Sequence, residues 1–165
     1  MRLLPRALLV GLAGIALAGP VTGQRTADDQ INPRSLELQR EAKALLAAGK
    51  LEQAADSLET ALAVDPRNRW AFTDLARVAD KQRLYRKAIR LTNRALLIEP
   101  NDPDAIAVQG EAMVELGAVA RAQANLQKLQ TICRQGCPQL AQLSAAISRG
   151  PSVAAAKPAS TPKTN

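Results

Sequence analysis

The sequence VDPRN at residues 64–68 and the sequence IEPND at residues 98–102 place two prolines, Pro66 and Pro100, 34 residues apart. Proline ends a helix and starts a turn, so each segment marks a boundary between two helical units. Self-similarity at a period of about 20 to 50 residues is typical of proteins built from stacked repeats. The recurrence therefore predicts that the chain folds as a short array of like units.

Small residues recur at the same spacing within these units. Two series are small throughout: Ala42, Ala76 and Gly110, and Ala54, Ala88 and Ala122. A third series has one larger member, and a fourth is mostly leucine: Ala61, Ala95 and Leu129, and Leu58, Thr92 and Leu126. Small side chains let two helices approach closely, so these series predict where the helices touch.

These positions resemble the tetratricopeptide repeat family over residues 35 to about 133, although that family usually has an aromatic residue in place of the leucine series. The resemblance implies two repeats and a degenerate third, over residues 35–68, 69–102 and 103–136. Gly49 and Gly117 stand at the turn between the two helices of the first and third repeats, where a residue with positive φ ends a helix at low cost. Arg83 replaces glycine in the second repeat, which leaves the geometry of the middle turn open.

The predicted helices are amphipathic, and the array needs a cap. Leu38, Ala42 and Leu45 fall on one face of the first helix, which cannot be buried by that helix alone. Stacked pairs leave the last apolar face uncovered, and residues 137–149 supply an amphipathic helix for it. We expect an all-α solenoid of about three helix-turn-helix repeats plus this C-terminal capping helix, seven helices in all.

The N-terminus reads as a secretory signal peptide over residues 1–23. Arg2 and Arg6 precede an apolar run that is short for a membrane span. Cleavage is expected after Gly23; cleavage after Ala18 and an uncleaved membrane anchor are the alternatives. The protein is therefore expected to be secreted across the inner membrane and to reside in the periplasm.

Two further segments are expected to lie outside the fold. Residues 24–33 are polar, and residues 150–165 consist mainly of Pro, Ala, Ser, Thr and Lys. Neither segment has enough large apolar residues to offset the entropy of ordering it, so both are predicted to be disordered.

Composition limits the function classes. The chain has no histidine, 2% aromatic residues and a formal net charge of +7, which falls to about +5 if a leader with two arginines is removed. That charge falls short of the dense basic stripe of a nucleic-acid-binding protein, and aromatic residues for base stacking are scarce. The sequence also has no phosphate-binding loop, nucleophile motif or distinct acid pair, so we expect no enzyme activity, no cofactor and no metal.

The resemblance implies that the first helix of each pair lines an inner surface that carries ligand contacts. The chain has these residues at the implied positions: Gln39, Lys43, Trp70, Thr73, Arg77, Asp80, Lys81, Asp104, Glu111 and Glu115. One side of this groove would be positive and the other negative, which would orient a peptide that carries both charges. The Lys and Asn pairs that clamp a terminal carboxylate in some family members are absent. Trp70 is either a binding anchor or packs with Phe72 against the first repeat.

The second helix of the middle repeat predicts another charged surface, on the convex side. Helical periodicity places five cations on one outward face: Arg83, Arg86, Lys87, Arg90 and Arg94. A solvated helix surface explains them, and so does contact with anionic lipid, cell-wall polymer or nucleic acid.

Cys133 and Cys137 are the only cysteines. In an oxidising compartment two cysteines one helical turn apart can form a disulfide, which would staple the capping helix to the helix before it. Metal binding and redox activity are weaker alternatives, because two thiols without histidine do not complete a tetrahedral site and the spacer has three residues.

The whole pattern resembles the small secreted tetratricopeptide proteins of Gram-negative bacteria. The leading hypothesis is an exported adaptor or scaffold that binds another protein or a peptide segment, in the cell envelope, through its concave groove. The alternative is an envelope-surface binder that uses the basic convex face.

Overall fold

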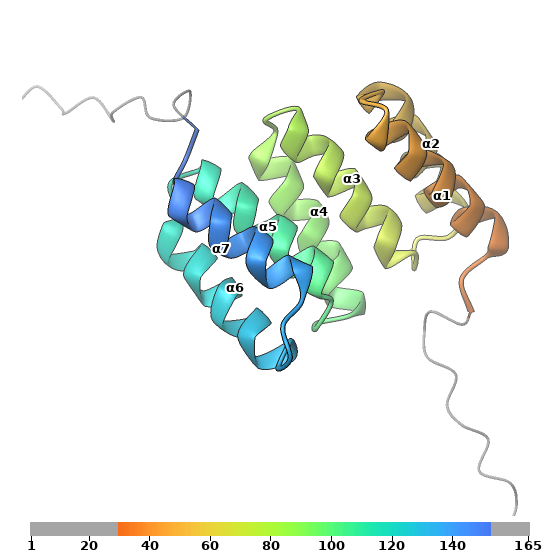
Figure 1. Ribbon diagram of the computed structural model, residues 1–165. Coiled ribbons are helices and arrows are strands. Elements are labelled where there is room, and N and C mark those ends of the chain that lie inside the picture. The colour runs from red at the N-terminus through yellow and green to blue at the C-terminus, as the bar shows by residue number, and fades with distance from the viewer. Residues whose placement is uncertain (1–29, 153–165) are drawn as a thin grey trace, which may run out of the picture.

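The computed structural model describes residues 30–152, and these residues form seven helices in stacked antiparallel pairs (Figure 1). The helices are α1 Pro33–Ala47, α2 Leu51–Val64, α3 Arg69–Lys81, α4 Tyr85–Ile98, α5 Pro103–Glu115, α6 Val119–Ile132 and α7 Pro138–Arg149. The described part of the chain has no strand, so the predicted all-α solenoid with a capping helix is confirmed. None of its helices is long and apolar enough to cross a membrane.

The proline segments between pairs also supply the caps of the next helices. The side chain of Asn68 accepts a hydrogen bond from the Ala71 amide at the start of α3. Asp102 accepts hydrogen bonds from the Asp104 and Ala105 amides at the start of α5. A capping oxygen satisfies amides that have no partner within the helix, so each linker both ends one pair and begins the next.

The turns within the three pairs share one backbone geometry. Gly49, Arg83 and Gly117 have φ values of 74°, 60° and 75°. In the middle turn the amide of Leu84 donates to the carbonyl of Ala79 at 2.8 Å, as the corresponding amides do in the other two turns. The absence of glycine therefore leaves the turn unchanged, but it holds Arg83 in the left-handed region, which costs about 1 to 2 kcal/mol for a residue with a Cβ atom.

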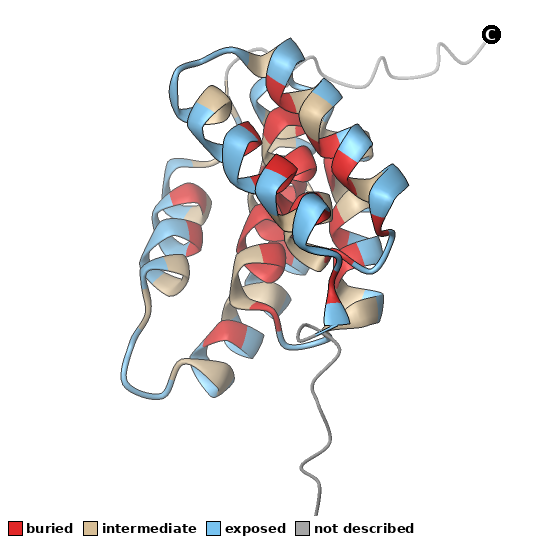
Figure 2. Ribbon diagram, turned by 90° about the vertical axis from the view of Figure 1, so that its right-hand side faces the viewer, coloured by how far each residue is buried: buried red, intermediate tan, exposed pale blue. Residues whose placement is uncertain are grey.

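The small-residue series lie where the helices meet, and the buried residues gather along these contacts (Figure 2). Ala42, Ala76 and Ala88 are fully buried. At Gly110 the contact is tighter still, because a Cβ atom there would lie 2.6 Å from Cδ1 of Leu143. The missing side chain allows α7 to pack closely on α5.

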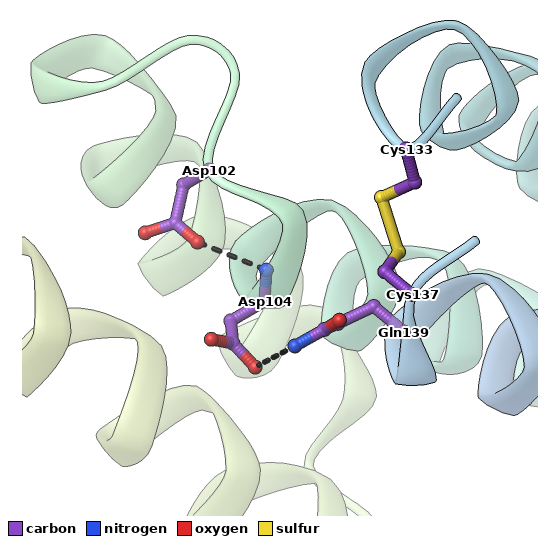
Figure 3. The surroundings of a disulfide bond; sticks show 5 residues. All are labelled: Asp102, Asp104, Cys133, Cys137 and Gln139. Atoms are coloured by element: carbon purple, nitrogen blue, oxygen red, sulfur yellow. Dashed lines mark hydrogen bonds between the residues drawn. A yellow bond between two sulfur atoms is a disulfide. The ribbon is translucent and has the colours of Figure 1, made fainter. Parts of the chain in front are cut away.

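Helix α7 closes the array by covering apolar residues of α5 and α6. Leu143 is fully buried in a cluster with Ile106 and Leu129. A disulfide joins Cys133, at the end of α6, to Cys137, just before α7, with a Cα–Cα distance of 5.6 Å (Figure 3). The predicted cysteine pair is therefore bonded in the structure and spans the elbow between the last two helices.

Parts of the two segments predicted to be disordered belong to the fold. Ile31 is 5% exposed, and the amide of Asn32 donates to the Asp65 carboxylate at 2.9 Å, so residues 30–33 belong to the fold. The amide of Ser152 donates to Glu115 at 2.9 Å, which orders the first residues of the predicted tail. The predicted signal peptide, residues 24–29 and residues 153–165 lie outside the described residues.

Candidate functional site

The odd-numbered helices line a groove that contains two adjoining hollows. The first hollow has a volume of about 380 Å³ and lies between α1, α3 and α5. The second has a volume of about 160 Å³ and lies between α3, α5 and α7. Arg77 and Lys81 of α3 line both hollows, so the two are continuous across this helix. We call the two hollows together the groove.

A row of polar contacts crosses the floor of the groove and links the four odd-numbered helices. Gln39 of α1 donates to Asp74 of α3. Arg77 donates to Asp74 at 2.7 Å and to Asp104 of α5 at 2.5 Å, and Gln139 of α7 donates to Asp104 at 3.2 Å (Figure 3). We call this row the ladder. Its two aspartates raise the pKa of Arg77 against the opposing effect of burial, so this arginine is a charged structural link.

The first hollow also contains two cations that are free of such links. Lys43 of α1 and Lys81 of α3 are exposed, and neither has an ion-pair partner within residues 30–152. Both lie beside the side chains of Leu46 and Ala47. This end of the groove offers two ammonium groups and a small apolar surface to a ligand.

The opposite end of the groove is acidic. Burial, together with the charges of Glu111 and Glu115, raises the pKa of Asp80 to about 6, and Lys81 only partly opposes the shift. The buried Oδ1 atom of Asp80 has no hydrogen-bond partner among the described residues. Burial likewise raises the pKa of Glu111, in spite of a hydrogen bond from Gln142. A cation bound beside Asp80 and Glu111 would supply the positive charge that favours their ionised forms.

Glu115, at the edge of this acidic region, is already engaged. Burial acts to raise its pKa, but hydrogen bonds from Ser152 and Tyr85 outweigh that effect and leave the pKa below its ordinary value.

The linings of the two hollows do not include Gln39, Thr73 or Trp70. Gln39 is 8% exposed and belongs to the ladder, and Thr73 is 1% exposed with its hydroxyl group on the Arg69 carbonyl. Both side chains are bonded inside the protein, so neither is open to a ligand in this structure. Trp70 is half-buried and lines neither hollow; its ring lies 4.4 Å from the Arg69 guanidinium.

The five cations predicted on the convex face divide into two groups. Four of them surround a hollow of about 360 Å³ at the edge formed by the turns: Arg83, Arg86, Lys87 and Arg90, together with Leu84, Tyr85 and Leu116. We call it the basic hollow. Arg94 lies apart from it, 6.0 Å from the Phe72 ring, beside a smaller hollow that includes Leu97.

Known proteins share this architecture. The tetratricopeptide repeat family model matches residues 45–111, from the end of α1 to α5. The Sgt2 tetratricopeptide domain from Aspergillus fumigatus superposes with a TM-score of 0.65 at 20% identity, covering 72% of this chain and 79% of that domain. The fold is that of a tetratricopeptide repeat domain. No protein with a curated description matches the sequence.

Two further similar structures have recorded partners or roles. The second such domain of human RPAP3, in complex with the HSP70 peptide SGPTIEEVD, has a TM-score of 0.62 at 20% identity and covers 70% of this chain and 95% of its own. SycD, a type III secretion translocator chaperone from Yersinia enterocolitica, has a TM-score of 0.62 at 19% identity and covers 72% of this chain and 89% of its own. At these identities the similarity shows the fold alone.

Proposed function

We propose that the protein is an exported, non-enzymatic adaptor that holds a segment of another protein in the groove. The observation that carries this proposal is the distribution of charge without ion-pair partners, with Lys43 at one end, Asp80 and Glu111 at the other, and Lys81 lining both hollows between them. The tetratricopeptide fold supports it, because a structure of this fold from human RPAP3 holds a peptide and SycD is a bacterial chaperone.

The groove suits a segment that carries both signs of charge. An acidic residue of the partner would pair with the two lysines, and a lysine or arginine would enter the second hollow beside Asp80. The ladder would hold the odd-numbered helices at fixed separations while the segment binds, so the charged ends would keep their distance. Electrostatic complementarity of this kind fixes the direction of a bound segment more than it raises affinity.

Export is the second part of the proposal. Residues 1–23 have the charge and apolar pattern of a signal peptide, and the bond between Cys133 and Cys137 suits an oxidising compartment. We therefore place the adaptor in the periplasm, with an envelope protein as its partner.

The test is crosslinking in cells followed by capture from the envelope fraction. The Lys43→Glu, Lys81→Glu variant reverses the free cations of the groove, and the Arg86→Glu, Arg90→Glu variant makes the same change in net charge at the basic hollow. We expect one discrete protein to be captured by the wild type and the second variant and lost from the first. Equal capture by all three forms, with equal helical circular dichroism, would remove the groove from the function.

A further inference from the structure

The basic hollow has a different construction from the groove. Arg83 lies in the turn between α3 and α4, and Arg86, Lys87 and Arg90 follow on the first turns of α4. Leu116, from the turn between α5 and α6, completes the lining. The hollow is therefore formed by two neighbouring turns and the helix between them.

The cations of the basic hollow form almost no ion pairs or hydrogen bonds with the rest of the described chain. Arg83, Arg86 and Arg90 form no side-chain hydrogen bond or ion pair within residues 30–152. Lys87 has only Glu59, at 3.7 Å, across an exposed surface. Like charges one helical turn apart destabilise a helix, and the left-handed backbone of Arg83 adds a local strain. A bound anion would relieve the repulsion, which within residues 30–152 only the contact between Lys87 and Glu59 opposes.

The same hollow exposes apolar surface between the charges. Leu84 is 48% exposed and Leu116 is 43% exposed, so two of the four exposed large hydrophobic residues in the described part lie here. Cations that surround exposed leucines form an amphipathic surface, which is the arrangement of proteins that lie at a membrane interface.

The hydrogen-bonding groups of the hollow distinguish a lipid from a peptide. Its charged side chains can only donate hydrogen bonds, and the Tyr85 hydroxyl is the one side-chain acceptor in its lining. A peptide backbone brings several N–H groups, for which the side chains of the lining offer only this one acceptor, and a donor left without a partner is costly. A phosphodiester only accepts hydrogen bonds, so it matches the lining.

We propose that the basic hollow binds the head group of an anionic phospholipid at a membrane surface, with Leu84 and Leu116 against the glycerol and upper acyl region. This site is separate from the groove and goes beyond the proposed adaptor function. The two together would hold a groove-bound protein segment close to the membrane.

The experiment is co-sedimentation of the protein, purified from the envelope fraction, with two kinds of vesicle. One kind is phosphatidylcholine alone, and the other is phosphatidylcholine mixed with phosphatidylglycerol. We expect salt-sensitive binding to the mixed vesicles only, and a loss of about tenfold or more in the Arg86→Glu, Arg90→Glu variant. The Leu84→Ser, Leu116→Ser variant should bind several-fold more weakly than the wild type while keeping the salt dependence.

The matched control is the Lys43→Glu, Lys81→Glu variant, which changes the net charge by the same amount but leaves the hollow intact. It should bind the mixed vesicles within about twofold of the wild type, whether or not it still captures a protein partner. An equal loss in both charge variants would reduce the effect to net charge and overturn the site. Equal binding to both kinds of vesicle would also overturn the site. The same holds if a poly-glutamate peptide displaces the protein from the mixed vesicles at a lower concentration than added phosphatidylglycerol vesicles do.

Discussion

The groove and the basic hollow both contain arginine and lysine, but they differ in whether these cations have carboxylate partners. In the groove Arg77 lies between Asp74 and Asp104. These contacts, with the one from Gln39 to Asp74, link α1, α3 and α5. In the basic hollow Arg86 and Arg90 have no ion-pair partner within residues 30–152. The same residue type is therefore a structural element in one place and an available ligand contact in the other, and only the positions of the carboxylates distinguish them.

The largest effect should come from removing the arginine at the centre of the ladder. Arg77→Ala leaves the carboxylate of Asp74, whose side chain is 4% exposed, without its cation. We expect the free energy of unfolding to fall by about 2 to 3 kcal/mol, less than for a fully buried pair because Arg77 is 28% exposed. Urea denaturation followed by circular dichroism measures it.

The contrasting variant is Arg86→Ala in the basic hollow. It should change the free energy of unfolding by no more than about 0.5 kcal/mol, because this side chain has no partner in the protein. Losses of equal size in the two variants would contradict the distinction between a structural arginine and an available one.

The second prediction concerns the acidic end of the groove and is a gain in stability. The pKa of Asp80 is about 6 in the folded protein and has a reference value of 3.8. The folded state therefore binds more protons between these values, so the penalty from Asp80 is absent below pH 4 and complete above pH 6. Asp80→Asn should raise the free energy of unfolding at neutral pH by about 2 kcal/mol, after allowance for partial exposure.

The pH profile supplies the check on this assignment. The wild type should gain stability as the pH falls from 7 to 5. The Asp80→Asn variant should show only a smaller gain over this range, which comes from the raised pKa of Glu111. If the two urea titrations shift in parallel over this range, the raised pKa does not belong to Asp80.

The third prediction tests the close packing of α7 on α5. Gly110→Ala would place a Cβ atom 2.6 Å from the buried Leu143 side chain and should cost about 1 to 2 kcal/mol. In a Leu143→Ala background the same change should instead be neutral or stabilising by about 0.5 to 1 kcal/mol, because alanine favours a helix over glycine. Thermal or urea unfolding of the four forms gives this coupling, and additivity would exclude the close contact.

The smallest effect concerns the turn that builds the basic hollow. Arg83→Gly removes the side-chain strain of the left-handed backbone and should raise the free energy of unfolding by about 0.5 kcal/mol, since greater chain entropy offsets part of the gain. Gly117→Ala, at the same position of the next pair, should lower it by about 1 kcal/mol. The arginine variant should also bind anionic vesicles more weakly, so stability and binding would change in opposite directions.

Sequence reasoning was most successful where the information is local or periodic. The spacing of Pro66 and Pro100 predicted the helix pairs, and the small-residue series predicted where the helices touch. These features depend on residues within one repeat and its neighbour, which a 34-residue period describes fully. The middle turn was left open only because Arg83 departs from glycine, and its backbone proved able to adopt the same conformation.

The candidate site was harder to predict, because its polar contacts join residues far apart in the chain. Gln39 and Asp74 are 35 residues apart, as are Asp104 and Gln139. The position within a repeat indicates that such a side chain faces the groove, but it does not indicate whether the side chain is hydrogen-bonded to another helix. The sequence does contain one indication of these contacts, which is the spacing of about one repeat between an amide side chain and a carboxylate. This spacing indicates that Gln39 bonds to the next repeat.

The bond between Cys133 and Cys137 also has a consequence for biosynthesis. Because the described chain has no other cysteine and the two are four residues apart, an isolated molecule has a single intramolecular pairing open to it. The ring can close as soon as the elbow between α6 and α7 emerges, before the repeats have stacked, and it requires an oxidant but no reshuffling of mispaired bonds. Under the proposed export, the array would acquire this disulfide without depending on a disulfide isomerase.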